Sequence, residues 1–144
     1  MNLEAAFSLF NLSALIGWIL LIFGPRRYRI VFYIPQYIIP TFLSLAYAGL
    51  MFSHFFTVEG GYGSLSEVGA LFSVNELLLA GWVHFLAFDL FIGAWIAERS
   101  DAIGIPRIMQ AVFLLATFMF GPVGLALFLG TSLGFTKKME QTHA

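Results

Sequence analysis

The sequence predicts an all-α integral membrane bundle of four transmembrane helices, forming a single membrane domain over residues 1–144. Apolar residues make up 60% of the chain and charged residues 10%, whereas a typical soluble domain has roughly 25% charged residues. A soluble protein of this size could not bury so much apolar surface, so lipid must cover the rest. The apolar residues also gather in continuous runs, which favour helices because the strands of a membrane barrel alternate in polarity.

Each run is long enough to cross roughly 30 Å of hydrocarbon, which takes about 20 helical residues. The predicted spans are Ala5–Phe23, Val31–Phe55, Asn75–Ala97 and Ile108–Leu129. The first is expected to stay in the mature protein, because no Lys or Arg precedes it and its run is long for a signal peptide. Pro35 and Pro40 in the second span, and Gly121-Pro122 in the fourth, predict kinks or close helix packing.

Arginine predicts how the spans are oriented. The short connections Gly24–Arg29 and Glu98–Arg107 hold every arginine of the chain, whereas the long connection Thr57–Val74 holds none. By the positive-inside rule, the two short connections face the cytoplasm or its topological equivalent, and both termini lie on the opposite side. Lys137 and Lys138 in the tail oppose this orientation, but they are fewer and come last.

The long connection Thr57–Val74 is rich in glycine and has two interpretations. It is a flexible linker, or its apolar end, Leu71-Phe72-Ser73, turns back to the membrane interface and covers a pocket.

The third span carries ionisable side chains at bilayer depth, where a charge costs a few kcal/mol or more and marks a candidate functional site. His84 and Asp89 straddle its middle and are the candidate catalytic residues. At about 100° per residue they lie about 140° apart around the helix, so at least one needs a partner on another helix. Glu76, near the start of the span, suits the helix dipole, so a structural role competes there with a role in the site.

The second span offers such partners. Gln36, Pro40, Tyr47 and His54 fall within about 40° of one another around its axis. At about 1.5 Å per residue, Tyr47 lies level with His84, and Gln36 or the carbonyls freed near Pro40 lie near Asp89. We therefore predict one polar pocket between the second and third spans, lined by Gln36, Tyr47, His84 and Asp89.

Aromatic side chains surround the two ionisable groups of the third span. Trp82, Phe85 and Phe88 either fill the lipid-facing surface or wall a pocket for a long apolar ligand, because such pockets are apolar with a few convergent polar groups. For His84 and Asp89, a structural role in joining helices is the alternative to a catalytic one.

The residue inventory excludes several classes of function. Cysteine is absent, which excludes thiolate metal sites and iron–sulfur clusters. Three histidines are too few for a histidine-rich di-iron site, and His54 and His84 differ too much in depth for bis-histidine haem. The only lysines, Lys137 and Lys138, lie outside the spans, which excludes a retinal Schiff base. A net charge of -1 provides no basic surface for nucleic acid. We expect neither a metal nor an organic cofactor.

The third span and the residues just before it carry a specific motif. It comprises Phe72-Ser73, Leu79-Ala80, Trp82, His84, Leu86 and Asp89-Leu90-Phe91. This motif resembles the plant abscisic-acid-deficient family and its bacterial relatives, which are linked to neoxanthin synthesis. Ile39-Pro40 followed by Tyr47 resembles the family's second span, and Gly121-Pro122-Val123-Gly124 its fourth. The resemblance covers Val31–Leu129.

The resemblance implies a membrane protein of carotenoid metabolism whose ligand is a long apolar carotenoid. In plants the family is required to convert violaxanthin into neoxanthin, a redox-neutral isomerisation that opens an epoxide to an allenic alcohol. Asp89 and His84 could deliver and remove the protons that this reaction needs, in either order. Gln36, Tyr47, Glu76, Trp82, Phe85 and Phe88 are the candidate substrate-binding residues.

The start of the chain does not look like a plastid transit peptide, which suggests a multi-pass protein of the bacterial inner membrane. Two other functions stay open at this point. One is a non-enzymatic protein that binds a carotenoid or lipid, or supports a membrane complex. The other is a small transporter.

Overall fold

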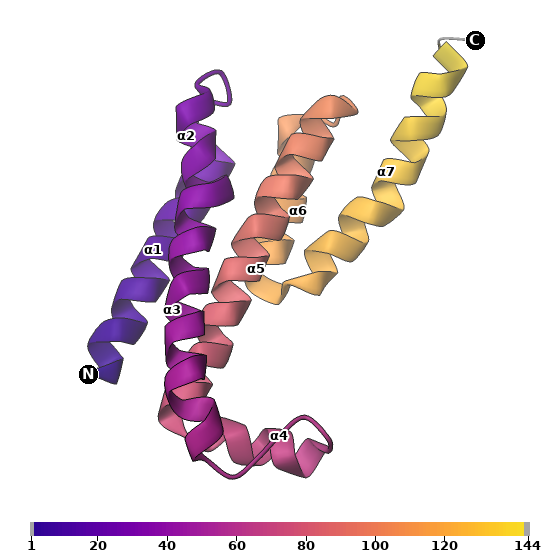
Figure 1. Cartoon of the computed structure of the whole chain (residues 1–144). Helices are drawn as coiled ribbons and strands as arrows, with labels where there is room; N and C mark the ends of the chain where they lie inside the picture. Colours follow the sequence, from indigo (N-terminus) through magenta and orange to yellow (C-terminus); the bar gives the residue numbers. More distant parts are fainter. Residues whose placement is uncertain (1, 143–144) are drawn as a thin grey trace.

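The computed structural model describes residues 2–142, with side chains up to Gly134, and every regular element in that range is helical. Helix α1 (Leu3–Phe23) makes the first crossing. The second crossing joins α2 (Arg29–Tyr33), a π-helical turn, α3 (Ile39–His54) and a closing 3-10 turn (Phe55–Thr57). Helix α5 (Asn75–Ala102) makes the third (Figure 1). All three crossings are long and apolar enough to span a membrane.

The second crossing stays continuous through its two prolines. Pro40 has no N–H to bond the carbonyl of Gln36. The chain accommodates this with the π-helical turn Ile34–Ile38, after which the Ile39 N–H donates to the Ile34 carbonyl. Such a turn adds one residue to the helical ring. The feature predicted as a kink is therefore a local widening just before α3.

Helix α5 is the centre of the bundle, packed against α1, α3 and α6. Small residues allow α1 to approach it closely. A Cβ on Gly17 would lie 2.5 Å from Leu90, and one on Gly93 would lie 2.5 Å from the Trp18 ring. Small residues are what membrane helix interfaces use in this way, because apolar burial gives little driving force inside lipid.

The predicted fourth span is not one crossing. Helix α6 (Arg107–Phe120) ends at Gly121, whose φ is +51°, and α7 (Pro122–Thr142) then runs back beside it (Figure 1). The antiparallel pairing brings the rings of Phe113 and Phe128 to 5.9 Å. At 1.5 Å per residue α6 is about 21 Å long, short of the roughly 30 Å of hydrocarbon. Three crossings and a re-entrant hairpin thus stand where the sequence predicted four crossings.

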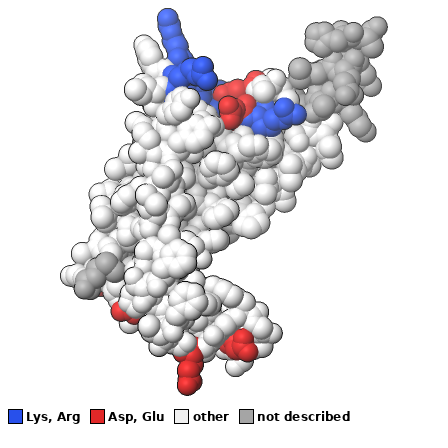
Figure 2. Space-filling view, in the orientation of Figure 1, with Lys and Arg blue, Asp and Glu red and all other residues white. Residues whose placement is uncertain are grey.

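The two ends of the bundle differ in charge, because all arginines lie at one end, together with Glu98 and Asp101, and the other end carries acidic residues (Figure 2). One end, which we call the arginine end, carries Arg26, Arg27, Arg29, Arg99 and Arg107. The opposite end, called the acidic end, carries Glu4, Glu59, Glu67 and Glu76. Helix α1 begins at the acidic end, the side on which the N-terminus was predicted (Figure 1).

The C-terminus itself, which was also predicted at the acidic end, lies outside the described residues. Helix α7 returns to the arginine end, because Gly121 reverses the chain partway across (Figure 1). The segment of α7 that contains Lys137 and Lys138 therefore runs on the arginine side, which removes the conflict with the positive-inside rule.

This topology predicts a specific labelling pattern. The chain has no native cysteine, so single cysteines report their own position. In intact cells we expect a membrane-impermeant maleimide to label Tyr62→Cys from outside, and Glu140→Cys only after the membrane is permeabilised. Labelling of both variants in intact cells would instead indicate four complete crossings.

Candidate functional site

His84 and Tyr47 meet in a cavity of about 230 Å³ between α3, α5 and the short helix α4 (Leu65–Phe72). Their ring centroids lie 5.3 Å apart, which confirms the predicted match in depth. Phe88, one turn further along α5, stacks on the imidazole at 4.6 Å. The other walls are mostly apolar, and the groups there that can exchange protons are His84 and the hydroxyl groups of Tyr47 and Tyr62.

Helix α4 covers this cavity at the acidic end (Figure 1). Ser64 caps it by accepting from the Glu67 N–H at 3.2 Å, while Glu67 accepts from the Gly63 N–H at 2.9 Å. Leu71 and Phe72 face inward, and a Cβ on Gly81 of α5 would lie 2.6 Å from the Phe72 ring. Of the two interpretations of the long connection, the structure supports the one in which its apolar end covers a pocket. We call this cavity the lid cavity.

Asp89 faces a different cavity, between α1, α5 and α6, of about 440 Å³. Trp82 and Phe85 line it as well, and the Trp82 indole N–H donates to the Asn11 side chain at 3.0 Å. A Cβ on Gly121 would lie 3.0 Å from both carboxylate oxygens of Asp89, so the carboxylate sits against the tip of the hairpin. One of these oxygens is buried without a hydrogen-bond partner.

The remaining candidates lie elsewhere. Gln36 donates to the Glu98 carboxylate at 2.9 Å and lines, with Phe88, a third cavity between α3 and α5. Glu76 lies in the first turn of α5. The imidazole of His54 is 3.0 Å from the Leu50 carbonyl of its own helix.

The single pocket expected from the sequence therefore does not form. Gln36, Tyr47, His84 and Asp89 are divided among three cavities. The angular separation of His84 and Asp89 is the reason, because α5 is packed on opposite faces and each side chain meets a different neighbour. No group of three or more His, Asp or Glu side chains in the described part of the chain is arranged to hold a metal ion.

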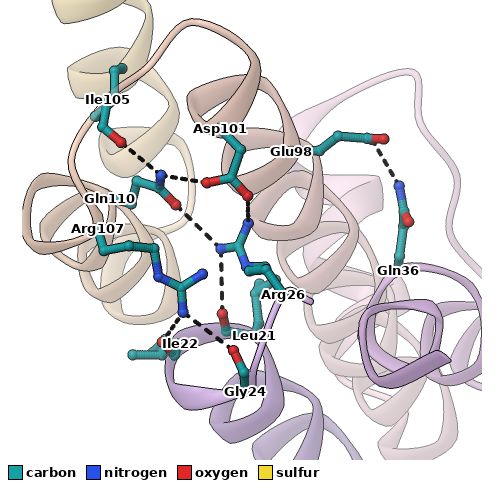
Figure 3. A network of polar contacts seen from close by, with 10 residues as sticks. All are labelled: Leu21, Ile22, Gly24, Arg26, Gln36, Glu98, Asp101, Ile105, Arg107 and Gln110. Atoms are coloured by element: carbon teal, nitrogen blue, oxygen red, sulfur yellow. Dashed lines mark hydrogen bonds and ion pairs between the residues drawn. The ribbon is translucent and has the colours of Figure 1, made fainter. Parts of the chain in front are cut away.

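A polar network at the arginine end was missed by the sequence analysis (Figure 3). Arg26 donates to Asp101 at 2.7 Å and to Gln110 at 3.3 Å, and Gln110 donates to Asp101 at 2.7 Å. Arg107 donates to the carbonyls of Ile22 and Gly24 at the end of α1. The signal was present in Gln110, an uncharged polar residue inside the predicted fourth span.

The network joins α1, α5 and α6 at the point where the hairpin leaves the bundle (Figure 3). Burial lowers the pKa of the Arg26 guanidinium, and the neighbouring Asp101 carboxylate acts in the opposite direction. An arginine keeps its charge under either influence, so the pair holds the helices electrostatically. We interpret this network as structural, since its charged and amide groups pair with one another across three helices, although the Arg26 Nε is buried without a partner.

Arg26→Met is expected to destabilise the protein by about 1–3 kcal/mol, because it leaves Asp101 and Gln110 without their cationic partner. Arg27→Met is the matched control, since Arg27 is exposed next to it. Thermal unfolding in detergent measures the difference. Equal melting temperatures for the two variants would show that the ion pair does not hold the hairpin.

Comparison with models of protein families gives a match. The family model described as ABA DEFICIENT 4-like matches residues 5–128, which includes the lid cavity, Asp89 and the tip of the hairpin. The comparisons with curated proteins and with solved structures gave no significant match. The matched range covers most of the sequence and confirms the resemblance inferred from the third span. This chain is a membrane protein that belongs to the ABA DEFICIENT 4-like family.

Proposed function

We propose that this protein is a redox-neutral isomerase that acts on the end group of a long carotenoid inside the lid cavity. Family membership supports a role in the carotenoid and abscisic acid pathway. The observation that carries the proposal is the pairing of His84 with Tyr47 in a mostly apolar cavity beneath α4. We place the protein in the inner membrane of a bacterium, with the arginine end in the cytoplasm.

The proposed reaction opens an epoxide to an allenic alcohol. The C–O bond breaks, the oxygen takes up a proton, and the neighbouring carbon of the chain loses one. No electrons enter or leave, so neither a redox cofactor nor an oxidant is needed. The reaction requires one proton donor and one proton acceptor within reach of the same end group.

Tyr47 and His84 can fill these two roles. In our proposal His84 removes the proton from carbon and the Tyr47 hydroxyl donates to the oxygen. The two side chains then exchange a proton and return to their starting states. This modifies the pair predicted from the sequence, in which Asp89 was the partner of His84, because Asp89 faces the other side of α5. A catalytic role for Asp89 stays a prediction.

The size of the lid cavity fits an end group better than a whole carotenoid. About 230 Å³ is below the range of roughly 300–1,000 Å³ that pockets for drug-sized ligands occupy. In the proposed complex the ring enters beneath α4 and the polyene chain stays in the lipid between helices. The lid would also keep water away from the strained, charged intermediate.

A non-enzymatic carotenoid-binding protein is the second candidate. It is favoured by the distribution of ionisable groups, since His84 and Asp89 lie in different cavities with mostly apolar walls. Such a site could hold the polar end of a pigment without changing it.

Expression in bacteria that accumulate a 5,6-epoxy carotenoid tests the proposal. We expect a product of unchanged mass with a shifted chromatographic retention and the infrared band of an allene. A purified protein that carries the unaltered epoxide would support the binding function. Absence of both product and bound pigment would exclude both functions for that class of carotenoid.

A further inference from the structure

A polar cavity of about 180 Å³ lies at the arginine end, between α2, the π-helical turn and the last turns of α5. Side chains of both charges line it, namely Arg26, Arg29, Glu98 and Asp101. Gln36 completes its polar wall and donates to Glu98 (Figure 3). We call it the head-group cavity, for the reasons given below.

Two of these four charges pair with each other and two do not. Arg26 and Asp101 form an ion pair at 2.7 Å. Within the described residues, Arg29 has neither a hydrogen bond nor an ion pair, and Glu98 accepts only from the neutral amide of Gln36, at 2.9 Å. One guanidinium group and one carboxylate in the same wall therefore lack an opposite charge. A ligand that carries both a negative and a positive group complements this pattern.

Aromatic rings supply a second contact for a positive group. Tyr33 and Tyr37 line the cavity, are half-exposed, and have ring centroids 5.2 Å apart. Their faces attract cations, and their hydroxyl groups can accept a hydrogen bond. The neighbouring ring of Phe32 already contacts a cation, because the Arg26 guanidinium lies 5.0 Å from its centroid. The two tyrosines remain free for an ammonium group of a ligand.

The surroundings of the cavity favour a lipid. A volume of about 180 Å³ is below the roughly 300–1,000 Å³ of pockets for whole drug-sized molecules, so a small head group suits it. Ile30 and Ile38 on the same stretch of chain are 77% and 60% exposed, which suits contact with acyl chains. Tyrosines such as Tyr33 and Tyr37 are common at the level of lipid head groups.

We propose that the head-group cavity binds phosphatidylethanolamine, with the phosphate at Arg29 and the primary ammonium between Glu98 and the two tyrosines. A primary ammonium donates three hydrogen bonds, whereas the trimethylammonium group of phosphatidylcholine donates none. An anionic lipid would leave Glu98 without a cation. This site does not depend on the proposed isomerase, because the lid cavity lies at the opposite, acidic end.

Native mass spectrometry of the intact protein in detergent tests the proposal. The protein is mixed with equal amounts of phosphatidylethanolamine, phosphatidylcholine and phosphatidylglycerol that share the same palmitoyl and oleoyl chains. We expect one phosphatidylethanolamine to be retained about three- to tenfold more than either other lipid, as a charge-assisted hydrogen bond at a partly exposed site provides. Equal retention would overturn the proposal. A preference for phosphatidylglycerol would also overturn it, since it would indicate a site for anionic lipid.

Matched variants locate the site. Glu98→Gln still accepts a hydrogen bond from Gln36 but loses its charge, so the preference over phosphatidylcholine should disappear. Glu59→Gln, exposed at the acidic end, should keep that preference. Arg29→Gln should weaken both lipids to the same extent, whereas Arg27→Gln, outside the cavity, should weaken neither. An unchanged preference in Glu98→Gln would place the head group elsewhere and overturn the proposal.

Two further measurements use the unmodified protein, so they do not depend on the folding of a variant. Phosphatidylethanolamine with one or two methyl groups on its nitrogen should bind progressively more weakly, because each methyl group removes a donor. Equal binding of these lipids would exclude hydrogen bonding by the ammonium. Soluble glycerophosphoethanolamine at the same concentration should not displace the lipid, because it has no acyl chains. Displacement would indicate a site for a soluble molecule and overturn the assignment of a lipid.

Discussion

Replacing His84 with Gln is expected to lower turnover of an epoxy carotenoid by about 10²–10⁴-fold, the usual contribution of a positioned acid–base group. Gln is close to His in size and keeps a hydrogen-bonding end, but it cannot take up a proton at neutral pH. The apolar walls of the lid cavity, including Leu71 and Phe72, remain in place. The variant should therefore keep the bound pigment and lose the product, which chromatography of membrane extracts measures directly.

His54→Gln is the matched control for this experiment. His54 lies on α3 near the same end of the bundle, but its imidazole contacts the Leu50 carbonyl and does not line the lid cavity. Its turnover should stay within about twofold of the unmodified protein. If His84→Gln retained full turnover, proton transfer by this imidazole would be ruled out, and the lid cavity would be a binding site only.

Gly124→Ala should have the largest effect on stability. The added Cβ would overlap the backbone of α6, meeting the Thr117 N–H and hydroxyl group and lying 2.6 Å from the Phe113 carbonyl. Two of these three atoms belong to the backbone and cannot rotate away, so α6 and α7 must separate. We expect a loss on the order of 3 kcal/mol or more, above the usual cost of overpacking a flexible core. Thermal unfolding in detergent measures it.

Gly130→Ala serves as the control on the same helix. Its Cβ would meet nothing within 4 Å, and replacing Gly by Ala in a helix normally stabilises by up to about 1 kcal/mol. The two variants change the same atom in opposite environments. A similar loss at both positions would mean that glycine itself, and not the contact with α6, determines stability in α7.

The hydropathy of the sequence was enough to predict the first three crossings, because each is a long apolar run. It failed at the fourth because hydropathy does not detect chain reversal. Gly121 and Pro122 are compatible with a kink in a continuous helix, and only the positive φ of Gly121 makes them a turn. Lys137 and Lys138 were the one sequence signal that opposed the predicted orientation. Charge, unlike hydropathy, indicates on which side of the membrane a segment lies.

In the candidate site, too, local helical geometry could be predicted from the sequence, whereas contacts that depend on the tertiary fold could not. Helical geometry correctly paired Tyr47 with His84, since both lie on regular stretches of α3 and α5. Asp89 could not be assigned from the second span alone, because its neighbour is the glycine at the hairpin tip, 32 residues later in the chain (121 − 89 = 32). Its position depends on a turn that no periodicity indicates.

The re-entrant hairpin gives the protein a different cross-section in each leaflet. On the arginine side, α6 and α7 lie beside the crossings, whereas at the acidic end the crossings α1, α3 and α5 are accompanied by the short helix α4 (Figure 1). A molecule of this shape is a wedge that displaces more lipid from one leaflet than from the other. Its insertion should relieve packing stress in a membrane that curves toward the narrower end of the protein. The protein should therefore collect in membrane regions of that curvature, and this sorting follows from Gly121, which reverses the chain.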